Sequence, residues 1–412
     1  MVGKMKSKAN YEILNQYKCN KSFYEDYALL SHYIQLQDST ENENYKRNLV
    51  AEGINLADIP GKNEFNKVLK VPFPNKDSKF TFIDLFAGIG GFRLAMQNLG
   101  GKCVFSSEWD DAAKQTYFEN YGEVPFGDIT KTEIKNLIPK QFDVLCAGFP
   151  CQAFSVAGYR KGFDDVRGTL FFDVADILEK HRPKVFFLEN VKNLQGHDDG
   201  KTFSKIMDVL ENRLKYRVFH NVMSPSEYAD IPQNRERIFI IGLDPQQVNM
   251  SDDYQFPFPG KMEKTVKIGD IINCDISDNA LTYNDKYNSR YYPQMKDVIK
   301  NKETVYQWRR VYVRENKSNE CPTLTANMGG GGHNVPLIWT GKEIRKLSPE
   351  ECLGFQGFPV GRPAGKNIDN PFRFPTTIAQ SKKYKQAGNS VTTPLIERVA
   401  KELIEYFKKH QK

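Results

Sequence analysis

The stretch FTFIDLFAGIGGF, residues 80–92, decides the fold, because an apolar strand runs through a glycine-rich turn into a helix. Glycines at such a turn let a ligand approach the backbone closely, beside the N-terminus of the helix. The dinucleotide fingerprint G-x-G-x-x-G is not met, since Arg93 stands where the third glycine would be. The turn therefore indicates a ligand site only in combination with other residues, because a turn without a ligand would explain it equally well.

Apolar strands and helical patterns alternate along the chain around this stretch. Strands are expected at residues 80–86, 103–106, 144–147, 185–188, 217–221 and 238–243, and helices at about 91–99, 112–120 and 393–407. Alternation of this kind is typical of a parallel α/β sheet. From about residue 244 to 337 the pattern gives way to polar sequence rich in tyrosine and proline. We therefore expect an α/β domain and a separate, less regular region.

The composition narrows the class of protein. Of the 412 residues, 40% are hydrophobic, and the net charge of +7 permits a nucleic-acid partner without requiring one. No apolar run approaches the ~18 residues of a membrane span and no signal-peptide core is present, so we expect a soluble, cytoplasmic protein. The seven cysteines are scattered and form no Cys-x-x-Cys pair, which argues against a disulfide framework and against a metal site.

Acidic residues follow two further strand ends. Glu108 comes after the strand at 103–106 and could accept hydrogen bonds from both hydroxyls of a ribose, and Trp109 offers a flat face to an adenine ring. Asp128 lies at a third strand end and could accept the adenine amino group. Together with the glycine turn, these residues predict an adenosine ligand without a pyrophosphate. S-adenosylmethionine fits this pattern, and NAD fits it less well.

Cys151 lies in the stretch DVLCAGFPCQAFS, residues 143–155, directly after a predicted strand. It would lie at the carboxyl edge of the sheet, where open α/β sheets bind ligands. A free thiol has a pKa of ~8.5, so the amides that begin the next helix would be needed to favour a thiolate. Cys146 lies within the apolar run and should be a plain core residue. Since a small buried hydrophobe is the usual role of a cysteine, both roles stay open for Cys151 at this point.

Six motifs, in this order, resemble those of the cytosine-C5 DNA methyltransferases of bacterial restriction–modification systems. They are DLFAGIGGF at 84–92, GFPCQ at 148–152, FLENV at 187–191, QNRER at 233–237, RKLSPEE at 345–351 and QAGNSV at 386–391. The match runs from about residue 79 to the C-terminus. The resemblance implies a Rossmann-like α/β domain that uses S-adenosylmethionine, with a smaller target-recognition domain that is mostly β or irregular.

The resemblance also implies roles for single residues. Cys151 resembles the nucleophile that adds to C6 of cytosine and makes C5 the attacking carbon. Glu189 resembles the acid that meets N3 and the exocyclic amine, Arg237 the cation that holds O2, and Arg235 a support for the cysteine loop and a nearby phosphate. The expected cofactor residues are Phe86, Gly88, Gly90, Gly91, Glu108, Trp109, Asp128, Pro150, Asn389 and Val391. The residues alone also allow plainer roles, such as a salt-bridge partner for Glu189 and an exposed strand edge for both arginines.

The resemblance also implies that the target cytosine lies inside duplex DNA and must be flipped out to be reached. The segment YQWRRVYVR at 306–314 interleaves aromatic residues with arginines, and the segment CPTLTANMGGGGH at 321–333 should be a loop that can approach a groove. An ordinary surface strand and a flexible linker are the alternatives for these two segments. The residues expected to contact DNA are Gln152, Ser155, Arg309, Arg310, Arg314, Thr325 and Asn327.

The expected domain limits are 1–78 for an N-terminal helical appendage, 79–244 with 386–412 for the catalytic domain, 245–359 for target recognition and 360–385 for a hinge. We expect the protein to be a monomer. The appendage lies outside the resemblance, so a chain beginning near Lys76 should fold and keep its sequence specificity. Two other functions stay open: a cytosine-C5 methyltransferase of RNA such as tRNA, and a non-catalytic DNA-binding relative. The long recognition region favours DNA, and the intact Cys151, Glu189 and Arg237 favour an enzyme.

Overall fold

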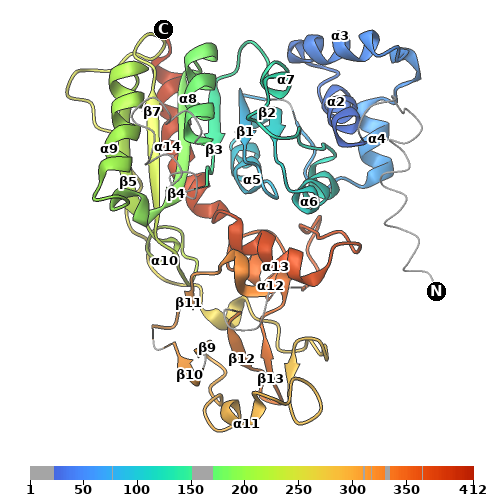
Figure 1. Cartoon of the computed structure of the whole chain (residues 1–412), viewed down its shortest axis with the longest axis vertical. Coiled ribbons are helices and arrows are strands. Elements are labelled where there is room, and N and C mark those ends of the chain that lie inside the picture. The colour runs from blue at the N-terminus through green and yellow to red at the C-terminus, as the bar shows by residue number, and fades with distance from the viewer. Residues whose placement is uncertain are drawn as a thin grey trace, which may run out of the picture. The chain divides into compact units, whose positions relative to one another are not determined.

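A computed structural model describes residues 23–76, 78–150, 170–309, 311–316, 318–329, 335–363 and 365–412. The chain divides into two compact units (Figure 1). The first holds the described residues up to Met223, then Arg237–Pro259 and Ile396–Lys412, and the second holds Ser224–Glu236 and Gly260–Leu395. This division differs from the expected limits. Residues 224–236 and 386–395 belong to the second unit, residues 245–259 belong to the first, and residues 360–385 do not stand apart as a hinge.

A six-stranded sheet forms the centre of the first unit, in the order β2-β1-β3-β4-β7-β5. Its strands are β1 (Phe80–Leu85), β2 (Gly101–Ser107), β3 (Val144–Ala147), β4 (Val185–Val191), β5 (Arg217–Met223) and β7 (Arg237–Leu243). These are the six strands predicted from the sequence, and the differences are confined to their ends. The apolar runs predicted them well because β1, β3 and β4 are buried along nearly their whole length.

The sheet is mixed, whereas the alternation predicted a parallel one. Strand β7 runs antiparallel to both of its neighbours, β4 and β5, while the pairs β1–β2, β1–β3 and β3–β4 are parallel. The chain leaves β5 at Met223 and re-enters the sheet at Arg237 from the same edge, so β7 must run back. A parallel return would need a crossover to the opposite edge. As a result, Arg237 pairs with Val191 at the end of β4.

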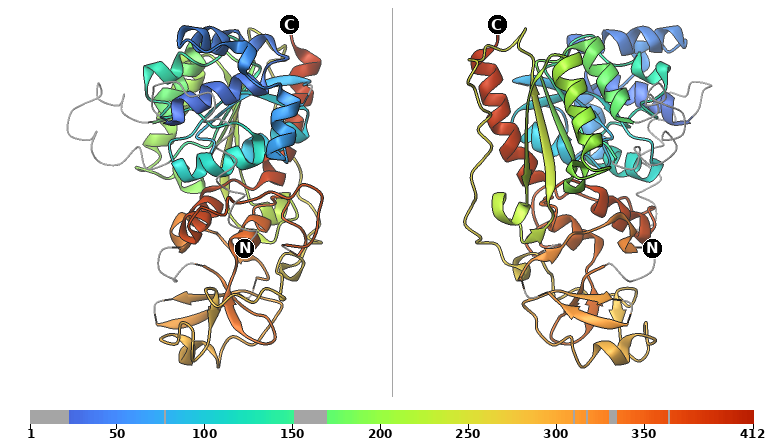
Figure 2. Two further views of the ribbon diagram at one scale, coloured as in Figure 1. Left: turned by 90° about the vertical axis from the view of Figure 1, so that its right-hand side faces the viewer. Right: turned by 60° about the vertical axis from the view of Figure 1, so that its left-hand side comes forward.

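Helices cover both faces of this sheet (Figures 1 and 2). Helices α5 (Gly91–Asn98) and α14 (Thr393–His410) share one face, where Asn98 hydrogen-bonds Glu397 and Phe407 packs on Phe80. Helices α8 (Leu170–His181) and α9 (Lys201–Asp208) lie on the other face. Helices α6 (Asp111–Tyr121) and α7 (Thr132–Lys135) follow the edge strand β2.

Three N-terminal helices, α2 (Phe23–Gln35), α3 (Glu43–Ala51) and α4 (Lys62–Leu69), belong to the first unit. They lie beside β2 and α6 (Figure 1). One hydrophobic core contains their side chains together with those of the sheet, including Tyr27, Leu30, Ile34, Tyr45, Leu49, Phe65, Val104, Phe105 and Phe126. This arrangement differs from the expected separable appendage. The apolar pattern of these helices is patchy, so it did not reveal that they bury the sheet edge.

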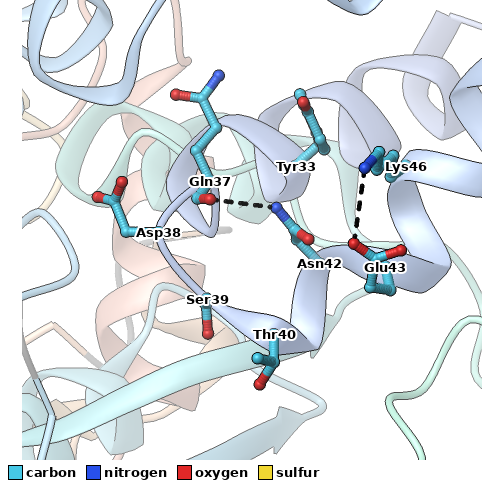
Figure 3. A pocket seen from close by; sticks show the side chains of 8 residues that line it. All are labelled: Tyr33, Gln37, Asp38, Ser39, Thr40, Asn42, Glu43 and Lys46. Carbon is cyan, nitrogen blue, oxygen red and sulfur yellow. Dashed lines mark hydrogen bonds and ion pairs between the residues drawn. The ribbon is translucent and has the colours of Figure 1, made fainter.

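A polar hollow of about 420 Å³ lies between α2 and α3 (Figure 3). Within its wall, Asn42 donates a hydrogen bond to the Gln37 carbonyl at 3.4 Å, and Lys46 Nζ lies 3.7 Å from Glu43 Oε1. None of the motif residues lines this hollow. We therefore assign the hollow no part in the chemistry of these motifs.

The second unit contains a five-stranded antiparallel sheet, in the order β10-β9-β12-β13-β8, and a parallel pair of short strands, β6 and β11. The strands are β6 (Gln233–Asn234), β8 (Thr282–Tyr283), β9 (Tyr306–Arg309), β10 (Tyr312–Glu315), β11 (Cys321–Pro322), β12 (Leu337–Trp339) and β13 (Ile344–Lys346). The helices are α10 (Pro225–Tyr228), α11 (Tyr292–Met295), α12 (Pro349–Gly354) and α13 (Gln380–Asn389).

The motif RKLSPEE joins β13 to α12 and has a structural explanation. The Arg345 guanidinium donates two hydrogen bonds of 2.8 Å to the two carboxylate oxygens of Glu351, and both side chains are fully buried. The Ser348 hydroxyl caps α12 by accepting a hydrogen bond from the Glu351 amide, and the Glu351 carboxylate accepts one from the Ser348 amide. This capping box and the bidentate ion pair hold the start of α12 against β13.

Candidate active site

The ends of five strands of the first unit lie at one edge of its sheet. Strands β1 to β4 are parallel, so their carboxyl ends meet there, and the antiparallel β7 begins at the same edge. This edge carries the glycine turn after β1, Glu108 after β2, Gly148–Pro150 after β3, Glu189 near the end of β4 and Arg237 at the start of β7. The sheet order therefore brings together residues from five of the predicted strands.

The glycine turn after β1 leaves space beside its backbone. Phe86, Gly88 and Gly90 all have positive φ angles, of 54°, 56° and 86°. A Cβ atom added at Gly88 would meet no atom within 4 Å, whereas one added at Gly90 would lie 2.3 Å from the Tyr121 ring. Gly90 is therefore required by packing, and Gly91 begins helix α5. Gly88 has open space in front of it, as expected of a turn that a ligand approaches.

Glu108 is tied to this turn. Its Oε2 accepts a hydrogen bond from the Gly88 amide at 2.8 Å, and its Oε1 accepts from the amides of Trp109 and Asp110 at 2.9 and 2.8 Å. The side chain is buried, and burial raises the pKa of the carboxyl, although the amide hydrogen bonds oppose this. Each carboxylate oxygen has two lone pairs, so Oε2 retains the capacity for one more hydrogen bond.

The two predicted adenine contacts flank Glu108. The Trp109 side chain is 80% exposed, so the faces of its indole ring are accessible. Asp128 is partly buried and forms a turn in which its Oδ1 accepts hydrogen bonds from the amide and the hydroxyl of Thr130. The segment before Asp128 runs along β2, because Phe126 pairs with Ser107 in a parallel bridge. Glu108 and Asp128 thus follow two adjacent backbone segments.

Asp84 is a functional candidate that the sequence reasoning did not single out. It lies in β1 beneath the glycine turn with 1% of its surface exposed, and neither carboxylate oxygen has a hydrogen-bond partner among the described residues. Burial raises the pKa of this carboxyl well above its ordinary value, while the charge and the nearby backbone amide of Arg93 oppose the rise without that amide reaching hydrogen-bond geometry. In the sequence, Asp84 could have been noticed because it is the single charged residue in an apolar strand. A buried, unsatisfied carboxyl beside a glycine turn is a natural partner for a polar ligand group.

Glu189 and Arg237 form an ion pair at the centre of the edge. Arg237 Nε lies 3.1 Å from Glu189 Oε1, and the two side chains are 15% and 11% exposed. Glu189 is paired with Phe239 across β4 and β7, so Arg237, two residues before Phe239, lies on the same face of the sheet. The plainer reading of Glu189 as a salt-bridge partner is thus compatible with the implied role, because the partner is Arg237 itself.

The residues before Cys151 lie against this pair. A Cβ atom added at Gly148 would lie 3.6 Å from Glu189 Oε2, an ordinary contact distance, so Gly148 lies directly beside this carboxylate. Asn190 Nδ2 donates a hydrogen bond of 2.9 Å to the Phe149 carbonyl, which ties the end of β3 to β4. Pro150 is exposed and is the last described residue of this segment. The predicted Cys151, Gln152 and Ser155 lie outside the described residues.

Arg235 belongs to the second unit, whereas Arg237 belongs to the first. The Arg235 guanidinium is buried and donates hydrogen bonds to the carbonyls of Leu324, Gly388 and Ser390 at 2.8, 3.1 and 2.7 Å. It therefore joins the QAGNSV motif to the segment 321–329. A Cβ atom added at Gly388 would lie 2.3 Å from the Thr325 backbone, so only glycine allows this approach. In the same motif Asn389 is exposed and Val391 is 9% exposed.

The predicted DNA contacts in the second unit are on its surface. Arg309 and Arg314 are exposed on the antiparallel pair β9–β10, whereas Trp308 is buried in the core of the sheet. Arg309 also donates a hydrogen bond of 2.9 Å to Gln307 Oε1. Thr325 and Asn327 are exposed as well, and Arg310 lies outside the described residues. The β9–β10 hairpin thus presents cations to solvent, as both a DNA contact and an ordinary surface strand would.

Among the described residues, no group of three or more His, Cys, Asp and Glu side chains is placed to hold a metal ion. None of the helices formed by these residues is both long and apolar enough to cross a lipid bilayer.

The first unit is an open α/β sheet whose carboxyl edge carries a glycine turn, the buried Glu108 and the Glu189–Arg237 pair, which is where open α/β sheets bind ligands. Solved structures of methyltransferases share this fold. Dnmt2 methyltransferase of S. pombe superposes with a TM-score of 0.59 at 17% identity, covering 79% of this chain and 99% of that one. The structure of Entamoeba histolytica methyltransferase EhMeth gives a TM-score of 0.55 at 16% identity, covering 80% of this chain and 98% of that one.

Sequence comparison places the chain within this class. The family described as C-5 cytosine-specific DNA methylase matches residues 80–405. The Type II methyltransferase M.Bsp6I of Bacillus sp. (strain RFL6) is 44% identical over 323 residues, which cover 77% of this chain and 96% of the relative. M.HpaII of Haemophilus parainfluenzae, also a Type II methyltransferase, is 42% identical over 352 residues, covering 81% and 91%. The chain belongs to the C-5 cytosine-specific DNA methylase family and is a DNA cytosine-5 methyltransferase.

Proposed function

We propose that this enzyme transfers a methyl group from S-adenosylmethionine to C5 of a cytosine flipped out of a specific short sequence in duplex DNA. It acts as a monomer in the cytoplasm, where the modification protects host DNA from a cognate restriction endonuclease. The observation that carries the proposal is the Glu189–Arg237 ion pair beside Gly148, three positions before Cys151. The similarity of the chain to Type II methyltransferases supports the restriction–modification role.

The residues at the strand ends fit S-adenosylmethionine. Gly88 has open space in front of its backbone, Glu108 retains hydrogen-bonding capacity, and the Trp109 indole is accessible for stacking on an adenine. Asp84 is a buried carboxyl with no hydrogen-bond partner among the described residues. When bound, S-adenosylmethionine supplies an electrophilic methyl group. Phe86, Gly90, Gly91, Asp128, Pro150, Asn389 and Val391 complete the proposed cofactor set.

Cys151 is the proposed nucleophile. Its thiolate adds to C6 of the flipped cytosine, which forms an S–C6 bond and moves electron density to C5, N3 and O2. C5 would then take the methyl group: the new carbon–carbon bond forms as the bond between the methyl group and the sulfonium sulfur breaks, and S-adenosylhomocysteine leaves with that electron pair. Loss of the proton from C5 and cleavage of the S–C6 bond restore the aromatic ring and the free thiol. The sequence context GFPCQ supports this assignment.

In this proposal Cys151 attacks C6, whereas Glu189 and Arg237 contact N3 and O2 on the other edge of the pyrimidine ring. Addition at C6 places negative charge on N3 and O2, and a fixed cation at O2 stabilises that charge. Glu189 meets N3 and the exocyclic amine. The ion pair holds both groups in place before the base arrives, so little reorganisation is needed.

Arg235 is a positioning residue in this scheme, because its guanidinium is engaged with three backbone carbonyls. Recognition of the duplex falls to Arg309, Arg310, Arg314, Thr325 and Asn327, with Gln152 and Ser155 near the flipped base. Arginine side chains read guanine edges and bind phosphates, which suits the exposed cations of the β9–β10 hairpin.

The test compares the wild-type enzyme with Cys151→Ala on duplex DNA. The variant should lose methyl transfer while binding S-adenosylmethionine normally, and a duplex containing 5-fluorocytosine should trap the wild type covalently, since fluorine at C5 blocks release. Retained turnover in Cys151→Ala would falsify the covalent mechanism. Methyl incorporation into tRNA in place of duplex DNA would instead show that RNA is the substrate, and bisulfite sequencing of methylated plasmid identifies the target sequence.

A further inference from the structure

The imidazole ring of His32 in helix α2 touches two backbone segments of the proposed cofactor site. Its Nε2 lies 3.3 Å from both the amide nitrogen and the hydroxyl of Ser106 in β2. The ring also stacks on Phe126, with 4.4 Å between ring centroids and an angle of 30° between the planes. His32 is fully buried, so these contacts are made within the core of the first unit.

Both contacted residues precede a proposed cofactor residue by two positions. Ser106 precedes Glu108, and Phe126 precedes Asp128. The two segments are also hydrogen-bonded to each other, since the Phe126 amide donates to the Ser106 carbonyl and the Glu108 amide donates to the Phe126 carbonyl, both at 2.9 Å. The imidazole ring of His32 therefore contacts both segments two residues before the proposed cofactor residues Glu108 and Asp128.

The hydrogen bonds of His32 assign its tautomer. Its Nδ1 lies 2.8 Å from the Ala28 carbonyl oxygen, which can only accept, so Nδ1 carries the proton. Nε2 is then the acceptor that the Ser106 amide requires. Burial lowers the pKa of His32 to about 3, with Arg93 adding repulsion, so the ring is neutral at physiological pH. Glu123 Oε1, at 3.8 Å from Nε2, therefore faces an uncharged ring.

Other N-terminal side chains bind β2 farther from the site. The Tyr45 hydroxyl donates to the Val104 carbonyl at 2.7 Å, and Asn75 Oδ1 accepts from the Cys103 amide at 3.2 Å. These contacts satisfy backbone groups of an edge strand that would otherwise lack partners. The Tyr45 ring also stacks on Phe126, with 5.7 Å between ring centroids, so His32 differs from Tyr45 and Asn75 in its hydrogen bond to Ser106, two residues before Glu108.

We propose that His32 is a positioning residue for S-adenosylmethionine, through which the N-terminal helices align Glu108 and Asp128 for the adenosine. The proposal rests on the cofactor site described under Proposed function. The family match begins at residue 80, so this support comes from a segment outside the part that the family shares. The N-terminal helices would thereby contribute to binding of the cofactor.

The experiment measures S-adenosylmethionine binding by calorimetry on three full-length variants. His32→Phe keeps a ring for stacking but leaves the Ser106 amide without an acceptor, so its Kd should rise by about three- to tenfold. His32→Gln, whose side-chain oxygen can accept from that amide, should recover most of the affinity. Tyr45→Phe is the matched control, because it removes one hydrogen bond to the same strand at Val104. Its Kd should equal that of the wild type.

The steady-state constants provide a second readout. His32→Phe should raise KM for S-adenosylmethionine with little change in kcat or in KM for DNA. A wild-type Kd in folded His32→Phe overturns the proposal. Equal weakening in His32→Phe and Tyr45→Phe also overturns it, because the effect would then follow general loss of stability.

Amide hydrogen exchange in the wild type keeps the proposal testable if His32→Phe does not fold. Because coupling is reciprocal, bound S-adenosylmethionine should slow exchange of the Ser106 amide more than that of the Cys103 amide. Equal slowing of the two amides overturns the proposal. A wild-type enzyme that binds no S-adenosylmethionine would contradict the proposed function itself, whatever the His32 variants do.

Discussion

Arg237 Nε lies 3.1 Å from Glu189 Oε1, across the antiparallel pair of strands β4 and β7. The two side chains come from different motifs, and only the return of the chain into β7 places them together. Because little of either side chain is exposed, removal of one partner leaves a charge with poor solvation. The pair thus links the proposed acid of the reaction to the cation that would stabilise negative charge on the base.

Arg237→Ala should lower the single-turnover rate of methyl transfer by about 10²-fold or more, because a fixed cation at a developing negative charge is worth about that much. Binding of S-adenosylmethionine should stay near the wild-type value. Rapid-quench measurement of labelled methyl transfer checks this. Arg213→Ala is the control, since Arg213 forms an exposed ion pair with Glu179 and should leave the rate unchanged. A rate near wild type in Arg237→Ala would remove this residue from the mechanism.

Glu108→Ala should weaken S-adenosylmethionine binding by about 1.5–3 kcal/mol, through loss of charge-assisted hydrogen bonds to the ribose. Calorimetry measures the change, and Glu108→Gln should show a smaller loss because one acceptor oxygen remains. Asp111→Ala removes a neighbouring exposed carboxylate and serves as the control. If Glu108→Ala binds the cofactor as tightly as the wild type, the ribose assignment is wrong.

A chain beginning at Lys76 should be insoluble, or should melt well below the full-length protein. It lacks α2, α3 and α4, so Val104, Phe105 and Phe126 lose buried contacts, and the Val104 carbonyl loses the Tyr45 hydroxyl. This expectation reverses the one drawn from the sequence alone. Thermal melting is the measurement, with a chain lacking only residues 1–22 for comparison. A soluble truncated protein with the wild-type melting temperature would restore the view of a separable appendage.

The stability of the enzyme should fall in mild acid, because the pKa of His32 is lower in the folded protein than in the unfolded chain. Its pKa is lowered from 6.5 to about 3 in the folded protein, mainly by burial. The unfolded chain takes up a proton on this ring near pH 6.5, whereas the folded protein does not until about pH 3. Stability that is present above pH 6.5 is therefore lost as the pH falls toward 3, by on the order of 3–5 kcal/mol.

Urea unfolding of the wild type and His32→Gln, from neutral pH to about pH 4.5, checks this prediction. The wild type should lose stability more steeply than the variant. The comparison is needed because burial raises the pKa of the neighbouring Glu123, which acts in the opposite direction in both proteins. Parallel pH profiles for the two proteins would show that His32 does not titrate as described.

The sequence by itself determined where the strands of the central sheet lie and which short motifs carry the proposed chemistry, because both are properties of contiguous residues. The six strands could be located because a strand buried on both faces is an apolar run, which is a local property. Family membership was likewise readable, since each motif is a short contiguous stretch. The position of Glu108 at a strand end and the turn at Gly88 followed from the same local pattern.

Only the tertiary structure decided which of these residues meet. It set β7 antiparallel between β4 and β5, paired Arg237 with Glu189, placed Gly388 against Thr325 and brought His32 to Ser106. The physical reason is that hydrophobic periodicity reports which side of an element is buried and not what buries it. Strand order and the return path of the chain choose the partner, and for the N-terminal helices that partner was the open edge of β2.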